Sequence, residues 1–154
     1  MSISPSPTPA IELSAEQYRL LADFRHRIRE FLHFSEEAAR QQGIEPQQHQ
    51  LLLALQGLPP NQKPTVSALA ARLCIRHHSA VELINRLSER GAVVRRNSEQ
   101  DRREVLVELT DKGQTILRSL SVLHWHQLKE SGAELARALE SIIEQSASEL
   151  RSHS

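Results

Sequence analysis

The spacing of apolar residues changes abruptly at Gly91, and this change limits most strongly what the chain can fold into. Between residues 65 and 90, two runs repeat apolar residues at i, i+3, i+4 and i+7, which predicts two amphipathic helices joined by a short break. After Gly91, the segments 92–96 and 104–109 resemble strands, and the polar residues between them are typical of a turn. The sequence therefore predicts a helical pair followed by one β-hairpin.

Most of the remaining chain is expected to be helical. Residues 1–10 alternate Ser or Thr with Pro, which predicts a disordered tail. A capping box at Ser14 opens a long amphipathic helix, and Pro46 opens a shorter one. Two further helices are expected after Thr110, separated at Gly132. The predicted fold is mainly α with one β-hairpin wing: a winged helix-turn-helix flanked by N- and C-terminal helices.

Basic residues are unevenly distributed, although the formal net charge is zero. Residues 72–103 contain eight arginines and four acidic residues, so this region is basic and the rest is acidic. Such a region suits a polyanion such as double-stranded DNA. The sequence contains no glycine-rich phosphate loop and no spaced nucleophile–base set, so we expect neither enzymatic activity nor a cofactor. The lack of an apolar leader or long apolar run predicts a cytoplasmic protein with no membrane contact.

The second predicted helix of the pair has a polar face that suits the major groove of DNA, which accepts an α-helix. Backbone N–H groups at its start favour a phosphate. Asn85 has the donor–acceptor pair that adenine presents, and Arg86 has the length to reach a guanine or a phosphate. The candidate DNA-binding residues are His77, His78, Ser79, Val81, Glu82, Asn85 and Arg86 on this helix, and Arg95, Arg96, Asp101, Arg102 and Arg103 on the hairpin.

Three motifs follow one another along this region: LSERGAVVR at 87–95, DRR at 101–103 and LTDKG at 109–113. A charged helix face or a charged turn alone is also typical of an ordinary solvated surface. In this order, however, the motifs resemble those of the MarR family of bacterial transcriptional regulators. The resemblance covers residues 65–113, and the helix layout of the rest agrees with it. Two positions depart from the family: Arg76 replaces the usual Ser or Asp cap, and Glu82 stands where a basic or small polar residue is common.

The resemblance implies a homodimer that binds a pseudo-palindromic operator in double-stranded DNA, with the two recognition helices about 34 Å apart. It also implies that Arg103 enters the minor groove, held by an ion pair from Asp101. Repression controlled by a ligand is the expected mechanism. The corresponding domains are a disordered tail (1–10), an N-terminal dimerisation helix (11–43), a winged helix-turn-helix DNA-binding domain (44–110) and C-terminal dimerisation helices (111–154).

The signal that regulates such a protein is open at this point. The hairpin is similar to that of hydroperoxide-sensing relatives, but residues 14–42 lack the cysteine those proteins use, and Cys74 is expected to be a half-buried filler. The histidines are poorly spaced for a metal, so no metal site is expected. A small anionic or aromatic effector is the remaining option, with Arg25, His33, His49, Trp125 and His126 as its candidate pocket. Trp125 is also a candidate for the dimer core.

Two other functions compete with this prediction. A winged helix can bind a protein instead of DNA, but such a module has no need for four arginines on one hairpin. The other alternative is a regulator that responds to redox state or to a metal.

Overall fold

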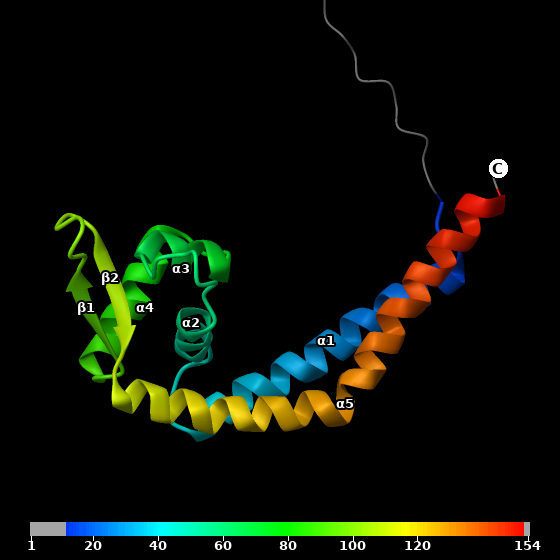
Figure 1. Ribbon diagram of the computed structural model, residues 1–154. Helices are drawn as coiled ribbons and strands as arrows, with labels where there is room; N and C mark the ends of the chain where they lie inside the picture. Colours follow the sequence, from blue (N-terminus) through cyan, green and yellow to red (C-terminus); the bar gives the residue numbers. More distant parts are fainter. Residues whose placement is uncertain (1–11, 153–154) are drawn as a thin grey trace, which may run out of the picture. The chain divides into compact units, whose positions relative to one another are not determined.

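A computed structural model describes residues 12–152, so the tail expected at 1–10 lies outside the described residues. The elements are α1 (Ala15–Gln41), α2 (Pro46–Gln56), α3 (Val66–Leu73), α4 (His77–Glu89), β1 (Val93–Asn97), β2 (Val105–Leu109) and α5 (Asp111–Ser152). This order of helices around one antiparallel hairpin confirms the predicted fold class (Figure 1). In the part of the chain that is described, no helix has the length and apolar character needed to span a bilayer.

The chain divides into two compact units. One contains residues 32–128 and therefore holds α2, α3, α4, the hairpin, the end of α1 and the start of α5. The other contains the remaining parts of α1 and α5. Each unit is described separately below.

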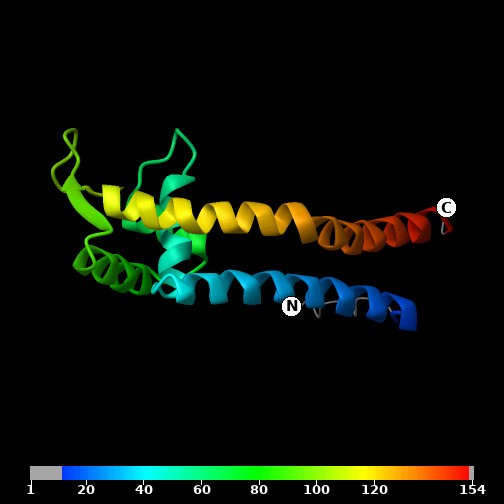
Figure 2. The same ribbon diagram turned by 90° about the horizontal axis from the view of Figure 1, so that it is seen from below.

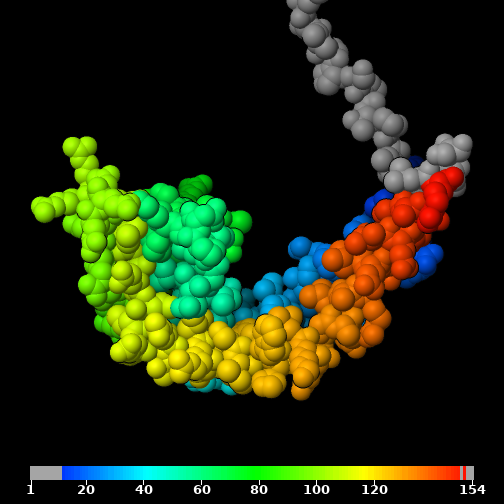
Figure 3. Space-filling view, viewed as in Figure 1, coloured from blue at the N-terminus to red at the C-terminus, as the bar shows by residue number. Residues whose placement is uncertain are grey.

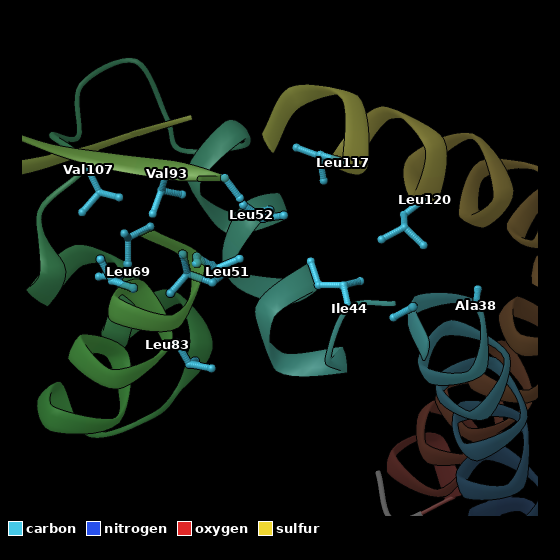
Figure 4. Packing of buried hydrophobic residues seen from close by; sticks show 14 residues of the cluster. Ala38, Ile44, Leu51, Leu52, Leu69, Leu83, Val93, Val107, Leu117 and Leu120 are labelled. Carbon is cyan, nitrogen blue, oxygen red and sulfur yellow. The ribbon is translucent and has the colours of Figure 1, made fainter. Parts of the chain in front are cut away.

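The unit of residues 32–128 is built around an aliphatic core. Its helices and its hairpin each contribute fully buried side chains, and Figure 4 shows Val93 and Val107 of the hairpin above Leu51, Leu52 and Leu69 of the helices. The beginning of α5 adds buried leucines to the same cluster. Burying a side chain of this size contributes about 1.5–3 kcal/mol. The core therefore holds the hairpin against the helical pair, and this sets the position of the arginines on the hairpin.

Local signals set the ends of the helical pair. Thr65 caps α3, since its hydroxyl accepts a hydrogen bond from the Ala68 N–H at 3.1 Å. α3 ends at Cys74, which has a left-handed backbone with φ 54° and ψ 39°. After α4, Gly91 takes φ +72° and the Ala92 N–H bonds back to the Leu87 carbonyl at 2.9 Å. These two left-handed residues make the sharp turns into and out of α4.

The hairpin pairs Val93 with Leu109 and Asn97 with Val105 in an antiparallel register. A third segment also joins it. Thr65 forms an isolated bridge to Leu106, and the Val107 N–H donates to the Pro64 carbonyl at 2.9 Å. The sequence did not predict this pairing, because a single bridge next to a proline leaves no alternating pattern.

Helix α5 is continuous from Asp111 to Ser152, so the predicted break at Gly132 is wrong. Glycine in a helix costs about 1 kcal/mol relative to alanine, which weakens a helix but does not end it. No proline lies within 111–152, and strong helix formers flank the glycine on both sides. Gly132 therefore lowers the stability of one long helix and does not separate two.

In the second unit, the N-terminal part of α1 and the C-terminal part of α5 lie side by side, as Figures 1 and 2 both show. The Arg27 guanidinium pairs with the Glu134 carboxylate at 2.8 Å, and the Gln17 amide donates to the Glu149 carboxylate. A shallow groove of about 150 Å³ lies between the two helices, lined by Leu13, Gln17, Leu20, Leu21, Ile142, Gln145 and Ser146.

Candidate nucleic-acid interface

Helix α4 has two clearly different faces. Ala80, Leu83, Ile84 and Leu87 are buried in the core. The opposite side chains are exposed, except Ser79 and Val81, which are half-buried; the exposed ones are His77, His78, Glu82, Asn85 and Arg86. His78, Glu82 and Asn85 share one side of the helix because they lie three or four residues apart. Five of the seven predicted recognition-helix residues are therefore accessible, and three of these share one side of the helix.

The first turn of α4 offers free backbone donors. Arg76 is the N-cap residue and makes no side-chain capping hydrogen bond within the described chain. The N–H groups at the start of a helix have no partner inside the helix, and they carry the positive end of its dipole. With His77 and His78 exposed beside them, these groups are suited to a phosphate oxygen.

The tip of the hairpin is a compact turn. The Ser98 N–H donates to the Glu104 carbonyl at 2.9 Å, and the Ser98 side chain is buried. Arg102 and Arg103 are exposed, and among residues 12–152 neither guanidinium has a hydrogen-bond or ion-pair partner. In Figure 3 the yellow-green loop between β1 and β2 projects from the surface of its unit. Two unpaired cations thus lie at the outermost point of the wing.

Asp101 contacts the backbone of Arg103 instead of its guanidinium. One carboxylate oxygen of Asp101 accepts a hydrogen bond from the Arg103 N–H at 3.0 Å, which is an Asx-turn. Between these two side chains the described chain has no ion pair, in contrast to the expectation from the resemblance. The short Asp side chain reaches the N–H two residues ahead more easily than the end of a long arginine. In the free protein, Asp101 therefore shapes the turn.

The two arginines of β1 contact different elements. The Arg95 guanidinium donates to the side-chain oxygen of Asn85 on α4. The Arg96 Nε donates to the Glu108 carboxylate on β2 at 2.6 Å, and both of these side chains are about half exposed or more. Arg95 and Arg96 were predicted only as wing cations, and no sequence pattern predicted the contact of Arg95 with α4.

The five residues predicted for an effector pocket lie in different surroundings. His49 is buried, with 1% of its surface exposed. Trp125 is 74% exposed, and Arg25, His33 and His126 also lie on the surface. The His49 ring packs against the ring of His124, which itself contacts Phe34, Ser35 and Leu120. The sequence did not predict the partners of His49.

Burial, and to a smaller extent the neighbouring His124, lowers the pKa of His49 to about 4. The Nε2 atom of His49 is buried with no hydrogen-bond partner among the described residues. His124 lies between a carbonyl and a hydroxyl: its Nδ1 is 2.6 Å from the Leu120 carbonyl oxygen, and its Nε2 is 2.6 Å from the Ser35 hydroxyl. Because a carbonyl only accepts, Nδ1 of His124 carries a hydrogen.

Cys74 is exposed, and this corrects the expectation of a half-buried filler. The left-handed backbone that ends α3 turns this residue out of the core. Over residues 12–152, no cluster of three or more His, Cys, Asp or Glu side chains could hold a metal ion.

Comparisons with known proteins agree with this geometry. Residues 42–104 match the model of the MarR family, which confirms the resemblance. AbsC, a MarR family transcriptional regulator from Streptomyces coelicolor, has a TM-score of 0.71 and 20% identity, over 93% of this chain and 99% of that one. MepR of S. aureus, solved as a DNA complex, has a TM-score of 0.64 and 16% identity, over 93% and 100%. Comparison with curated proteins finds no match. At these identities the solved structures show the shared fold.

Proposed function

We propose that this chain, whose residues 42–104 match the model of the MarR family, is a transcription regulator that binds a specific sequence of double-stranded DNA. One observation carries the proposal: the exposed polar face of α4 lies beside a hairpin whose tip presents the unpaired guanidinium groups of Arg102 and Arg103. A helix of this kind fits the major groove, and an arginine at a wing tip suits the narrow, negative minor groove. The proposed role is a binding role without catalysis, in the cytoplasm.

Each candidate residue has a place in this proposal. His77, His78 and Ser79 lie at the α4 N-terminus, where they and the free N–H groups contact a phosphate. Val81, Glu82, Asn85 and Arg86 follow on the same helix and face base edges and the backbone. Arg103 enters the minor groove, while Arg95, Arg96 and Arg102 add positive charge and Asp101 holds the turn.

Dimerisation belongs to the same proposal. The unit formed by the ends of α1 and α5 leaves large apolar side chains on its surface, including Tyr18 at 62% exposure and Ile143 at 58%. Leu21 and Leu139 are also exposed. Such a row of apolar side chains on two adjacent helices is typical of an interface. We assign residues 11–43 and 111–154 to dimerisation and residues 44–110 to DNA binding, with the operator read as two half-sites.

The proposed regulation is repression controlled by a small anionic or aromatic effector. Two titratable or aromatic candidates for it, Trp125 and His126, are exposed on α5, and Arg25 and His33 are exposed on α1. His49 is buried against His124, so in this proposal it supports the packing around the effector site and does not contact the effector directly.

The test is the salt dependence of binding to duplex DNA, measured by fluorescence anisotropy with fragments selected from a random duplex pool. The affinity should fall steeply with salt, since each neutralised phosphate contributes about −0.9 to the slope of log K against log salt. Arg103→Ala should flatten this slope by about one for each copy of the wing on the DNA. Arg137→Ala, which removes one exposed charge from the other unit, should leave the slope unchanged. Weak binding that is equal for both variants and the parent would instead favour a protein-binding winged helix.

A further inference from the structure

The hydrogen bond between Arg95 and Asn85 fixes the orientation of the Asn85 side-chain amide. A guanidinium has only donors, so the atom of Asn85 that faces Arg95 is the oxygen. The amide nitrogen, with its two hydrogens, is then directed elsewhere. Asn85 lies on the exposed face of α4, so this –NH₂ group is the part of the side chain left for a ligand.

The hairpin register explains why Arg95 reaches α4 and Arg96 does not. Side chains alternate along a strand, so Arg95 shares a sheet face with Val93, which is buried against the helices. Arg96 is on the other face, where it pairs with Glu108 at 2.6 Å. The two arginines are neighbours of equal charge, but only Arg95 contacts the recognition helix.

We propose that Arg95 is a positioning residue that sets the base preference of Asn85 to guanine. This inference depends on the proposed function, since it concerns how the same α4 surface reads DNA. Guanine presents two adjacent acceptors in the major groove, N7 and O6, which match an amide –NH₂ group. Adenine presents an acceptor beside an amino donor, and its bidentate pairing with asparagine needs the amide oxygen. In this protein the Asn85 oxygen is engaged by a cationic donor that is stronger than an adenine amino group.

The inference reverses the preference for adenine that Asn85 suggests as an isolated residue. It also separates two roles for the wing. The guanidinium groups of Arg102 and Arg103 have no partner within residues 12–152, so they remain free for DNA. Arg95 acts through another side chain, and its contribution should appear in sequence preference more than in affinity.

The experiment uses the full chain and three substitutions. Duplexes are enriched from a random pool by the parent, and affinities are then measured for the enriched duplex and for versions that change one base pair at a time. Asn85→Ala identifies the base pair that Asn85 reads, because discrimination disappears there. Arg95→Met removes the donor but keeps an unbranched side chain of similar length. Arg96→Met is the matched control, since it removes the adjacent charge on the opposite sheet face.

The parent should prefer guanine over adenine roughly tenfold at the Asn85 position, the discrimination of a good two-bond contact. Arg95→Met should lose that preference or shift it to adenine, because the freed amide can turn. Arg96→Met should lower the affinity for all duplexes together and leave the guanine-to-adenine ratio unchanged. Circular dichroism of each variant checks that the fold is retained.

Two results would overturn the inference while leaving the proposed function intact. One is an Arg95→Met protein that discriminates guanine from adenine as the parent does. The other is an Arg95→Met protein whose affinity for all duplexes falls by the same factor, as expected for Arg96→Met. That result would make Arg95 a phosphate contact. A parent that enriches no duplex at all would overturn the proposed function, and the inference with it.

Discussion

The imidazole rings of His49 and His124 are stacked with their centroids 4.8 Å apart and their planes tilted by 33°. His49 comes from α2 and His124 from α5, so the pair joins two helices of the same unit. The pKa of His49 is lowered to about 4, from 6.5, mainly because the ring is buried. A charged ring at this position is unfavourable, since it would lack solvation and would lie against a second histidine.

Stability should therefore fall as the solution becomes acidic. Between pH 6.5 and about 4 the unfolded chain binds a proton at His49 that the folded chain does not, so the free energy of unfolding rises with pH over this window. A shift of this size corresponds to about 3 kcal/mol between pH 7 and pH 4. Urea unfolding at several pH values measures it.

The contribution of His49 is isolated by His49→Leu. This variant should lose most of the acid-dependent part of the stability, so the two curves should run parallel above pH 6.5 and the difference between them should shift in favour of the variant as the pH falls towards 4. His26→Leu, at an exposed position on α1, serves as the control and should keep the pH dependence of the parent. An identical slope for His49→Leu and the parent would mean that His49 does not titrate abnormally.

The glycine of the LTDKG motif is required by close backbone packing. A Cβ placed on Gly113 would lie 2.0 Å from the Ala92 carbonyl oxygen, which real contacts never allow. Gly113→Ala should therefore destabilise the protein by about 1–3 kcal/mol, although alanine is the better helix former. Gln114→Ala, at the next and exposed position, should be neutral or slightly stabilising. Thermal unfolding of the two variants compares them, and a Gly113→Ala protein as stable as the parent would contradict this close approach of the two backbones.

Replacing Asp101 should change the affinity for duplex DNA through two effects of opposite sign. Removing a negative charge from the wing should strengthen DNA binding through electrostatics. Removing the Asx-turn should weaken it, because the hydrogen bond to the Arg103 N–H orders the turn and contributes about 0.5–1.5 kcal/mol. We expect the turn to dominate, so Asp101→Ala should bind duplex DNA two- to tenfold more weakly. Glu99→Ala removes a neighbouring exposed charge and should bind slightly more tightly. Tighter binding by both variants would assign Asp101 a purely electrostatic effect.

The proposed dimer can be tested at one exposed apolar residue. Ile143 lies on α5 with 58% of its surface exposed. Ile143→Glu should produce monomers, because burying a carboxylate in an apolar interface is costly, while helix content should stay unchanged. Glu144→Ala, the adjacent exposed position, should leave the oligomeric state of the parent. Light scattering after size-exclusion chromatography measures the mass, and a parent protein that is already monomeric would contradict the dimer.

Periodicity predicted the elements that pack on the core. The buried positions of α4 recur at helical spacing, and β2 buries Val107 within an alternating sequence, so the change at Gly91 was visible in the sequence. Gly132 was misread because glycine is common at helix ends and is also tolerated inside helices. The bridge from Thr65 to Leu106 consists of one residue pair and has no period at all.

The side-chain contacts of the candidate interface were not predictable in the same way. The candidate α4 and wing residues were identified from their order along the chain, but their partners were not. Arg95 and Asn85 are ten residues apart on different elements, and the contact depends on the sheet face that Arg95 occupies. Similarly, His49 and His124 meet only because the core brings α2 and α5 together. Pairings of this kind are decided by the three-dimensional packing.

The tight approach of Gly113 to Ala92 also limits movement. Thr110 adds two bonds at the same place, from its N–H to the Ala92 carbonyl at 3.1 Å and from its hydroxyl to the Gly91 carbonyl at 2.5 Å. The first turn of α5 and the start of β1 are thus held together by close backbone packing and by the hydrogen bonds of Thr110. If the first turn of α5 rotates, β1 must therefore rotate with it, because the two segments form one rigid unit. Such a rotation would also move Arg95 and Arg96.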